Sequence, residues 1–253
     1  MKWLASILLI TLLAHDDRFE YREGGIIRGP VGEKKLALEF TADEFTEGGT
    51  TILNALATHH AKASFFLTGR CVRHPGNQPL VRRIVADGHY LGPHSDSHPL
   101  LCPWTGPKKT LLTKDAFVEE MEQNIGAIEQ FGVKRQVIKY FIPPYEWYNE
   151  EIAGWAAELN LFLINFTPGT RSNADYTEDN APNFVSSKAI MASIIAREKK
   201  EGLNGFLLLM HIGTGPHRTD KMSDHIGELI EYLQGRGYQL VRVDELLAQK
   251  SDL

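Results

Sequence analysis

The sequence of 253 residues predicts a single α/β domain in which strands and helices form a barrel-like arrangement. Apolar segments typical of strands alternate with amphipathic segments typical of helices, in about seven consecutive pairs. The strand-like segments are continuously apolar, as expected for parallel strands covered on both faces. No linker, low-complexity tract or internal repeat divides the chain, and its 43% hydrophobic content suffices for one large core.

In the first half of the chain, turn and cap residues separate the predicted elements. The strand KKLALEF (34–40) precedes the helix GGTTILNALATHH (48–60). The buried strand ASFFLTG (63–69) precedes the helix QPLVRRIVADG (78–88), which has proline near its start and glycine at its end. HYLGPHSDSHP (89–99) is predicted to be a short strand that runs into a proline-bounded bend.

The same alternation continues in the second half. TKDAFVEEMEQNIGAIEQFG (113–132) is a long amphipathic helix with a threonine cap and a terminal glycine. Prolines stop the strand KYFIPPY (139–145), and Asn149 caps the helix that follows it. The remaining predicted elements are the helix at 149–160, the strand at 161–168, the helix at 186–202, the strand at 205–213, the helix at 224–237 and a last strand and turn at 238–247.

The amino terminus is predicted to be a secretory signal peptide, residues 1–15, followed by one domain, 16–253. Lys2 precedes an apolar run to Ala14 that is too short to span a bilayer, which predicts a secreted or periplasmic protein without stable membrane insertion. A buried helix is the alternative. The net charge of -5 argues against nucleic-acid binding. Cys71 and Cys102 allow one disulfide or two free thiols, and neither belongs to a CxxC pair.

Candidate functional residues directly follow the predicted strands. In such barrels the carboxyl ends of the strands carry the chemistry, so these side chains are expected at one rim. They are, in chain order, Asp43 and Glu44, His94 and His98, Pro144 and Tyr145, residues 167–171, and His211.

Two histidines lie four residues apart in PHSDSHP, at positions 94 and 98. If the bend turns helically, both rings face the same way. Two neutral imidazoles at this spacing are half of a zinc-type site. With a carboxylate as the third ligand, the ion would keep positions open for water and substrate, as in catalytic zinc sites. Two ordinary loop histidines are the alternative.

The acid pair of FTADEF and the histidine of LLLMHIG complete this set. Asp43 and Glu44 are costly if both ionise in a confined site, which favours one binding a cation while the other handles a proton. A solvated turn is the alternative. His211 has a side chain whose ordinary pKa suits a general acid near neutral pH, although a structural histidine is also common after such a strand.

Together these motifs resemble those of the NodB-homology polysaccharide deacetylases, the family-four carbohydrate esterases. The resemblance covers the chain from about Lys34 to Leu247. The family's TFDDG, H-S/T-x-x-H, RxPY and late L-x-H motifs correspond here to TADE, HSDSH, IPPYEW and LLMHIG. The resemblance implies a distorted (β/α)7 barrel that hydrolyses N- or O-acetyl groups of a glycan and releases acetate.

The resemblance also implies a role for each rim residue. Glu44, His94 and His98 would hold a divalent metal, zinc by preference, with cobalt or nickel as alternatives. Asp43 would be the general base. The backbone N–H near Tyr145 would help to stabilise the oxyanion, and His211 would protonate the leaving group.

The sequence departs from the family motifs in three places. Glu44 stands where the family has its metal-binding aspartate, so Asp43 on the metal is an alternative, and a third alignment puts Ala42 at the position of the base. Ile142 stands where RxPY has the arginine thought to steady the base, and Arg171 is our candidate for that missing charge. The family's fourth motif is not recognisable.

Aromatic and polar residues of the rim loops are candidate substrate contacts. Trp104 and Trp147 offer faces for stacking on sugar rings, and Pro144 and Arg171 lie on the same predicted rim. These residues are also compatible with two other functions. One is a non-catalytic carbohydrate-binding relative, favoured by Ile142 and the altered acid pair, and the other is an amidase acting on a non-sugar C–N bond.

Overall fold

A parallel sheet lies at the centre of the computed structural model. Strand β3 (Lys35–Ala42) pairs with β4 (Ser64–Leu67) on one side and with β8 (Leu207–His211) on the other. Strand β5 (Tyr90–Pro93) extends the sheet beyond β4, and β9 (Gln239–Leu240) pairs with the first residues of β3. Because all these pairings are parallel, the carboxyl ends of β3, β4, β5 and β8 lie at one edge.

Side chains of the central strand alternate between two apolar cores. Leu38 and Phe40 of β3 belong to the larger core, which also includes residues of the surrounding helices, whereas Ala37 belongs to a smaller core inside the ring of strands. Strand β4 divides in the same way, with Phe65 in the larger core and Phe66 in the smaller one. Both faces of the sheet are therefore apolar, which explains the continuous apolar runs in the sequence.

Two short strands and single hydrogen bonds connect β5 to β8, so that the strands form a ring. Strand β6 (Tyr140–Phe141) pairs in parallel with β7 (Phe162–Leu163). The Ile142 N–H donates to the carbonyl of Pro93 at 3.3 Å, which links β6 to β5, and the Thr167 N–H donates to the carbonyl of Leu207 at 2.9 Å, which links the chain after β7 to β8. The predicted distorted (β/α) barrel is confirmed.

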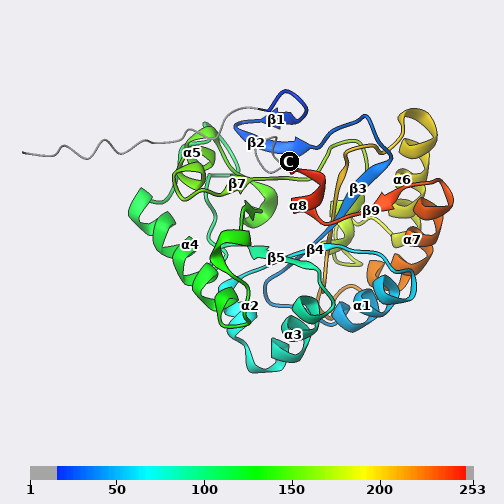
Figure 1. The fold of residues 1–253 in the computed structure, drawn as a ribbon, viewed down its shortest axis with the longest axis horizontal. Coiled ribbons are helices and arrows are strands. Elements are labelled where there is room, and N and C mark those ends of the chain that lie inside the picture. Colours follow the sequence, from blue (N-terminus) through cyan, green and yellow to red (C-terminus); the bar gives the residue numbers. More distant parts are fainter. Residues whose placement is uncertain (1–15, 249–253) are drawn as a thin grey trace, which may run out of the picture.

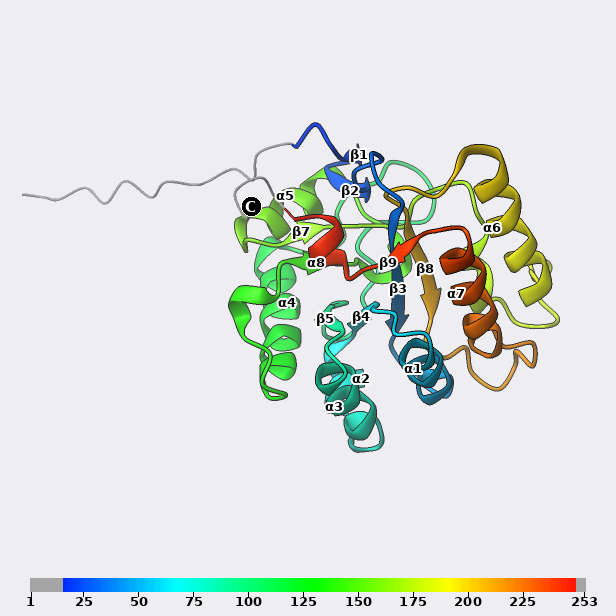
Figure 2. The ribbon, with the colours of Figure 1, turned by 45° about the vertical axis from the view of Figure 1, so that its right-hand side comes forward.

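Helices surround the strands, close to the positions that the sequence predicts. In both Figure 1 and Figure 2, α4 lies on one side of the strands and α6 and α7 lie on the other. The predicted caps are present, because Thr113 accepts the Ala116 N–H and Asn149 accepts the Ile152 N–H. The long helices are α1 (Gly49–Thr58), α3 (Gln78–Ala86), α4 (Lys114–Glu129), α5 (Glu150–Glu158), α6 (Ser187–Glu201) and α7 (Ile226–Gly235).

Several short elements were not predicted from the sequence. An antiparallel hairpin of β1 (Glu20–Arg22) and β2 (Gly25–Arg28) and helix α8 (Val243–Leu246) contribute to the smaller core. Helix α2 (Gly69–Arg73) begins where we expected a strand to end, because Thr68 caps it by accepting the Cys71 N–H at 3.2 Å. Short 3-10 helices cover Pro75–Asn77, Arg135–Val137, Pro144–Glu146, Ser172–Tyr176 and Met222–His225.

The structure describes residues 16–248, so the predicted signal peptide, residues 1–15, lies outside it. Within the described part of the chain, no helix has the length and apolar character needed to cross a membrane. Both cysteines lie in this part, and both are buried free thiols. Burial raises the pKa of the Cys71 thiol to about 12, so this thiol stays protonated at neutral pH.

One buried carboxyl group stands out inside the barrel. Glu39 of β3 is fully buried, and neither of its side-chain oxygens has a hydrogen-bond partner among residues 16–248. Burial, with a smaller contribution from Glu146, raises the pKa of Glu39 well above its usual range. The folded chain therefore retains this proton to higher pH than the unfolded chain does, and folding stability falls as the pH rises above the ordinary glutamate pKa.

We predict that Glu39→Gln stabilises the protein by about 1–3 kcal/mol at pH 8, because a neutral amide removes the cost of ionising a buried acid. The gain should shrink toward pH 5, where wild-type Glu39 is protonated in the folded state. Urea denaturation of both proteins at pH 5 and pH 8 measures this difference. Glu231→Gln, which changes an exposed glutamate of α7, is the control. Equal gains at the two pH values would contradict the prediction.

Candidate active site

Two histidines meet at the end of β5. The Nε2 atoms of His94 and His98 lie 3.3 Å apart, and the His94 Nδ1 lies 2.8 Å from the carbonyl oxygen of Ile142. Because a carbonyl only accepts hydrogen bonds, Nδ1 of His94 carries the proton and its Nε2 keeps a lone pair directed at His98. We expected a helical bend, but the bend is not helical. Ser95 and His98 have φ angles of 66° and 62°, and these left-handed residues turn the chain so that the rings meet.

The geometry of this pair fits two ligands of one tetrahedral metal ion. Zinc–nitrogen distances of about 2.0–2.1 Å at a tetrahedral angle place two ligand nitrogens about 3.3 Å apart. A carbonyl on the other nitrogen of His94 is also usual, because metal-bound histidines commonly donate their second N–H to such an acceptor. The two histidines therefore fit as two ligands of a metal site that would need at least one more.

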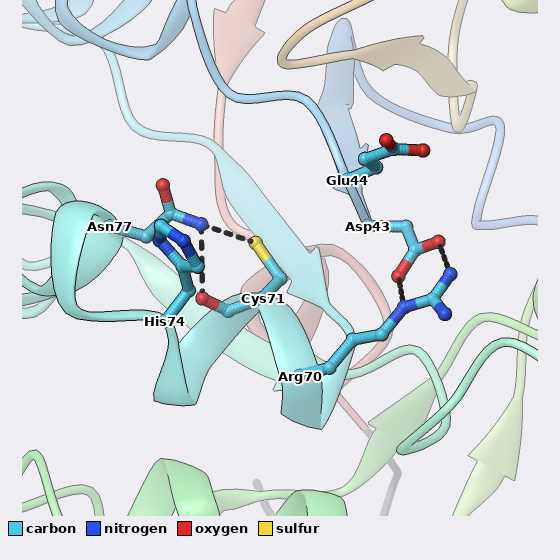
Figure 3. A pocket seen from close by; sticks show the side chains of 6 residues that line it. All are labelled: Asp43, Glu44, Arg70, Cys71, His74 and Asn77. Carbon is cyan, nitrogen blue, oxygen red and sulfur yellow. Dashed lines mark hydrogen bonds and ion pairs between the residues drawn. The ribbon is translucent and has the colours of Figure 1, made fainter.

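The third predicted ligand does not lie with the histidines. Residues 16–248 contain no group of three or more His, Cys, Asp or Glu side chains arranged to hold a metal ion. Glu44 is exposed, and Figure 3 shows its side chain pointing away from that of Asp43. The chain bends at Asp43 and Glu44, directly after the end of β3.

The bend that carries His94 and His98, called here the histidine bend, is held in place by hydrogen bonds to α2. We call this set of hydrogen bonds the clasp. The Gly69 N–H donates to the carbonyl of Ser95 at 3.0 Å, and Arg73 donates two hydrogen bonds to the carboxylate of Asp96 at 2.6 and 2.7 Å. Glu120 of α4 accepts the Asp96 N–H from the other side at 2.9 Å. The bend is thus held by two helices, which explains how it keeps two left-handed residues.

Asp43 is held as an oriented carboxylate. Its Oδ1 accepts hydrogen bonds from Thr68 Oγ1 at 2.9 Å and from Arg70 Nε at 2.5 Å, and its Oδ2 accepts one from Arg70 Nη2. Burial opposes ionisation, but the hydrogen bonds from Arg70 and Thr68 outweigh it and lower the pKa of Asp43. Asp43 is therefore ionised at neutral pH, as a proton acceptor must be.

The arginine beside Asp43 is not the one we expected. Arg171 is exposed, its backbone N–H donates to Ser193 Oγ, and Arg70 occupies the position next to the carboxylate. The hypothesis that Arg171 supplies the missing charge is therefore wrong. Ile142, which stands at the motif arginine position, is buried in the smaller core.

A cavity of about 470 Å³ opens beside this carboxylate (Figure 3). Charged and amide side chains line it together with apolar atoms, which leaves hydrogen-bonding groups for a hydroxyl-bearing ligand, and its volume is within the usual range for small-molecule sites. The lining residues are Asp43, Glu44, Arg70, Cys71, His74 and Asn77.

His211, the last residue of β8, is held by a buried aspartate. Its Nδ1 lies 2.7 Å from Asp175 Oδ1, and its backbone N–H donates to Asp175 Oδ2 at 2.8 Å. Burial alone would lower the pKa of His211, but Asp175 and, to a smaller extent, Glu146 outweigh this and raise it. The imidazole therefore keeps its second proton to higher pH than a free histidine does, which suits a general acid.

Aromatic side chains line the other edge of the histidine pair. The Tyr145 ring lies 4.4 Å from that of His98 and 5.3 Å from that of Trp104, and Trp104 stacks on Trp147 at 6.1 Å. Trp104 and Tyr145 are exposed, so their faces are open to a ligand, whereas Pro144 is buried. Tyr145 has a φ of 60°, a left-handed conformation that is uncommon for a residue other than glycine.

Two residues that complete the site were missed at the level of sequence. Arg70 directly follows the strand-like ASFFLT, and Asp175 lies in TRSNADY between a strand and a helix. Both residues lie at the predicted rim, and this location was the only signal in the sequence that could have indicated a role in the site. Their side-chain partners were not predictable, because each pairs with a residue more than 25 positions away in the chain.

Comparison with known proteins identifies a sequence family and a common fold. A family model described as "Polysaccharide deacetylase" matches residues 28–163. The uncharacterized protein YlxY of Bacillus subtilis is 30% identical over 78% of this chain and 52% of its own length. The peptidoglycan-N-acetylglucosamine deacetylase PgdA of Listeria monocytogenes is 27% identical over 86% of this chain and 40% of its own length. The chain thus spans about half or less of these relatives.

Solved structures show the same fold. The Bc1960 peptidoglycan N-acetylglucosamine deacetylase superposes with a TM-score of 0.71 at 22% identity, covering 90% of this chain and 94% of the other. The pseudoenzyme BA3943 of Bacillus anthracis superposes with a TM-score of 0.69 at 22% identity, covering 89% of this chain and 69% of the other. At this identity the likeness shows the fold alone.

We predict that Gly69→Ala destabilises the protein by about 1–3 kcal/mol, because a methyl group would overpack the clasp. An added Cβ would lie 1.9 Å from Asp96 Oδ1, between α2 and the bend. Urea denaturation measures the change in the free energy of unfolding. Gly126→Ala in α4, where an added Cβ meets nothing within 4 Å, should be neutral or stabilising. A neutral Gly69→Ala would show that the clasp tolerates a side chain there.

We predict that Asp175→Asn lowers the pKa of His211, because the amide removes the negative charge that stabilises the imidazolium. Titration of the imidazole followed by NMR measures the pKa directly. Asp224→Asn removes an exposed carboxylate elsewhere and should leave the His211 titration unchanged. An unchanged pKa in Asp175→Asn would mean that Asp175 positions the ring without setting its charge.

Proposed function

Because the chain belongs to the polysaccharide deacetylase family, we propose that it hydrolyses N- or O-acetyl groups of a glycan with the help of a divalent metal ion, zinc by preference and cobalt or nickel as alternatives. The observation that carries the metal dependence is the histidine pair, in which the Nε2 atoms of His94 and His98 lie 3.3 Å apart beside an ionised carboxylate. Two imidazoles with this separation and one fixed tautomer are suited to share a cation.

Two carboxylates are available as the third ligand. Asp43 already accepts hydrogen bonds from Arg70 and Thr68, whereas Glu44 is exposed and has no hydrogen-bond partner among the described residues. Because Asp43 already accepts these hydrogen bonds, we keep Asp43 as the base and Glu44 as the ligand, which requires the Glu44 side chain to turn from its direction in Figure 3. Asp43 as the ligand is the alternative. The bound metal ion would make a water molecule more acidic and polarise the acetyl carbonyl.

The residues of this chain would then move two protons. Asp43, held as a carboxylate, takes the proton of the attacking water. His211, whose imidazolium form is stabilised by Asp175, gives a proton to the leaving amine or alkoxide. The N–H groups of Glu146 and Trp147 are bonded to the carbonyls of Pro143 and Pro144, so the Tyr145 N–H is the candidate donor to the oxyanion.

Exposed aromatic rings beside the histidine pair would bind the sugar. Trp104 and Tyr145 offer open faces, and Trp147 supports Trp104 from behind. Arg171 is retained only as a candidate substrate contact, because it is exposed on a loop that follows β7. Peptidoglycan deacetylases are among the relatives, which makes an N-acetylated cell-wall glycan outside the cytoplasm the first substrate to test. The predicted signal peptide is consistent with this location.

A second candidate function is sugar binding without catalysis. It is favoured by the absence of a third metal ligand next to the histidines within residues 16–248, and by Ile142 at the motif arginine position. A binding protein would keep the barrel and the aromatic rings while releasing no acetate. Calorimetry with soluble glycan fragments, combined with an acetate assay, distinguishes the two functions.

We predict that the metal-stripped protein releases acetate from N-acetylated glycan oligomers only after zinc, cobalt or nickel is added. His94→Ala/His98→Ala should abolish both metal binding and acetate release, because it removes the histidine pair that we propose as ligands of the ion. His225→Ala, a histidine of the Met222–His225 helix, is the control. A double variant that binds metal and releases acetate like the wild type would refute the proposal.

The role of the base is tested separately. Asp43→Asn should lower kcat by about 10²–10⁴-fold, the usual contribution of a general base, while glycan binding persists. If Asp43→Asn releases acetate with the same kcat as the wild type, another residue is the base. Glycan binding with no acetate release by the wild type, across amide and ester substrates, would favour the binding protein.

A further inference from the structure

We propose that Arg70 is the positioning residue for the base Asp43 and takes the place of the arginine that this chain lacks at position 142. This inference rests on the proposed deacetylase function. It is carried by the two hydrogen bonds that the Arg70 guanidinium donates to the Asp43 carboxylate, one to each oxygen.

The place of Arg70 in the fold explains how it reaches the base. Strand β4 is the direct neighbour of β3, and Ala42 at the end of β3 pairs with Leu67 at the end of β4. Arg70 follows three residues later in the first turn of α2, on the same rim as Asp43. Ile142 follows β6, which is not paired with β3, and its side chain is buried in the smaller core.

The hydrogen bonds leave the carboxylate one free acceptor position. A carboxylate has about four lone-pair sites. Two sites on Oδ1 are used by Thr68 Oγ1 and Arg70 Nε, and one on Oδ2 is used by Arg70 Nη2. The remaining site of Oδ2 is the one that can take a proton. A planar, bidentate guanidinium therefore fixes both the orientation of the carboxylate and the direction of its remaining lone pair.

Arg70 also connects the base to the histidine pair. Its backbone N–H donates to the carbonyl of Asp96 at 3.1 Å, within the bend that carries His94 and His98. One residue therefore binds the base through its side chain and the histidine bend through its backbone. This double attachment sets the distance between the base and the ligand pair, and misplacing reacting groups by about 1 Å costs about 10²-fold in rate.

Chemical rescue with guanidinium ion tests the inference, because the Arg70 side chain is 54% exposed and its truncation would leave a solvent-accessible gap beside Asp43. In Arg70→Ala we expect kcat for acetate release to fall about 10²-fold, with KM changed much less. Low millimolar guanidinium should restore kcat at least about tenfold. Arg70→Lys should retain part of the activity, since it keeps the charge and loses the bidentate geometry.

Arg73→Ala is the matched control. Arg73 lies on the same helix and also binds a carboxylate through two hydrogen bonds, but that carboxylate belongs to Asp96 of the clasp. Arg73→Ala should lower the free energy of unfolding, and guanidinium ion should not restore kcat in this variant as it does in Arg70→Ala. Circular dichroism and urea denaturation show whether each variant is folded.

The outcomes separate this inference from the function on which it rests. An inactive wild type overturns both, since there is then no base to position. An active wild type with a folded Arg70→Ala variant of unchanged kcat overturns the role of Arg70 alone. Equal losses in Arg70→Ala and Arg73→Ala, with no rescue of either, also overturn it and assign Arg70 to the stability of the clasp.

Discussion

The rest of the structure depends on the parallel pairing of β3 with β4 and β8. This register puts the ends of three strands side by side, so that Asp43, Arg70 and His211 lie on one rim although they are far apart in the sequence. Strand β5 extends the same rim to His94. The pairing is stabilised by burial of apolar side chains on both faces of β3, which is the dominant favourable contribution to folding.

Opposite electrostatic environments separate the two ionisable groups that would move protons. A guanidinium and a hydroxyl lower the pKa of Asp43 despite its burial, whereas the carboxylates of Asp175 and Glu146 raise the pKa of His211 despite its burial. Pairs of groups whose pKa values are pushed apart in this way are typical of a base and an acid acting in the same site. The described residues thus contain one group suited to accept a proton and one suited to donate it, as the proposed reaction requires.

The clasp between α2 and the histidine bend connects fold stability to the site. Gly69 and Arg73 of α2 hold a bend that contains two left-handed residues, and Arg70 of the same helix holds the base. Strained backbone of this kind persists only where its surroundings fix it. Substitutions in α2 are therefore expected to change stability and chemistry together.

The sequence by itself determined the order of strands and helices, the barrel and the rim position of the acid pair and the histidines, because apolar periodicity and cap residues are local signals. It also pointed to the family through short motifs. Tertiary structure alone decided which charges meet. The arginine beside Asp43 is Arg70 and not Arg171, the partner of His211 is Asp175, and the side chain of Glu44 points away from that of Asp43. Pairing across strands brings these groups together, and no local pattern encodes it.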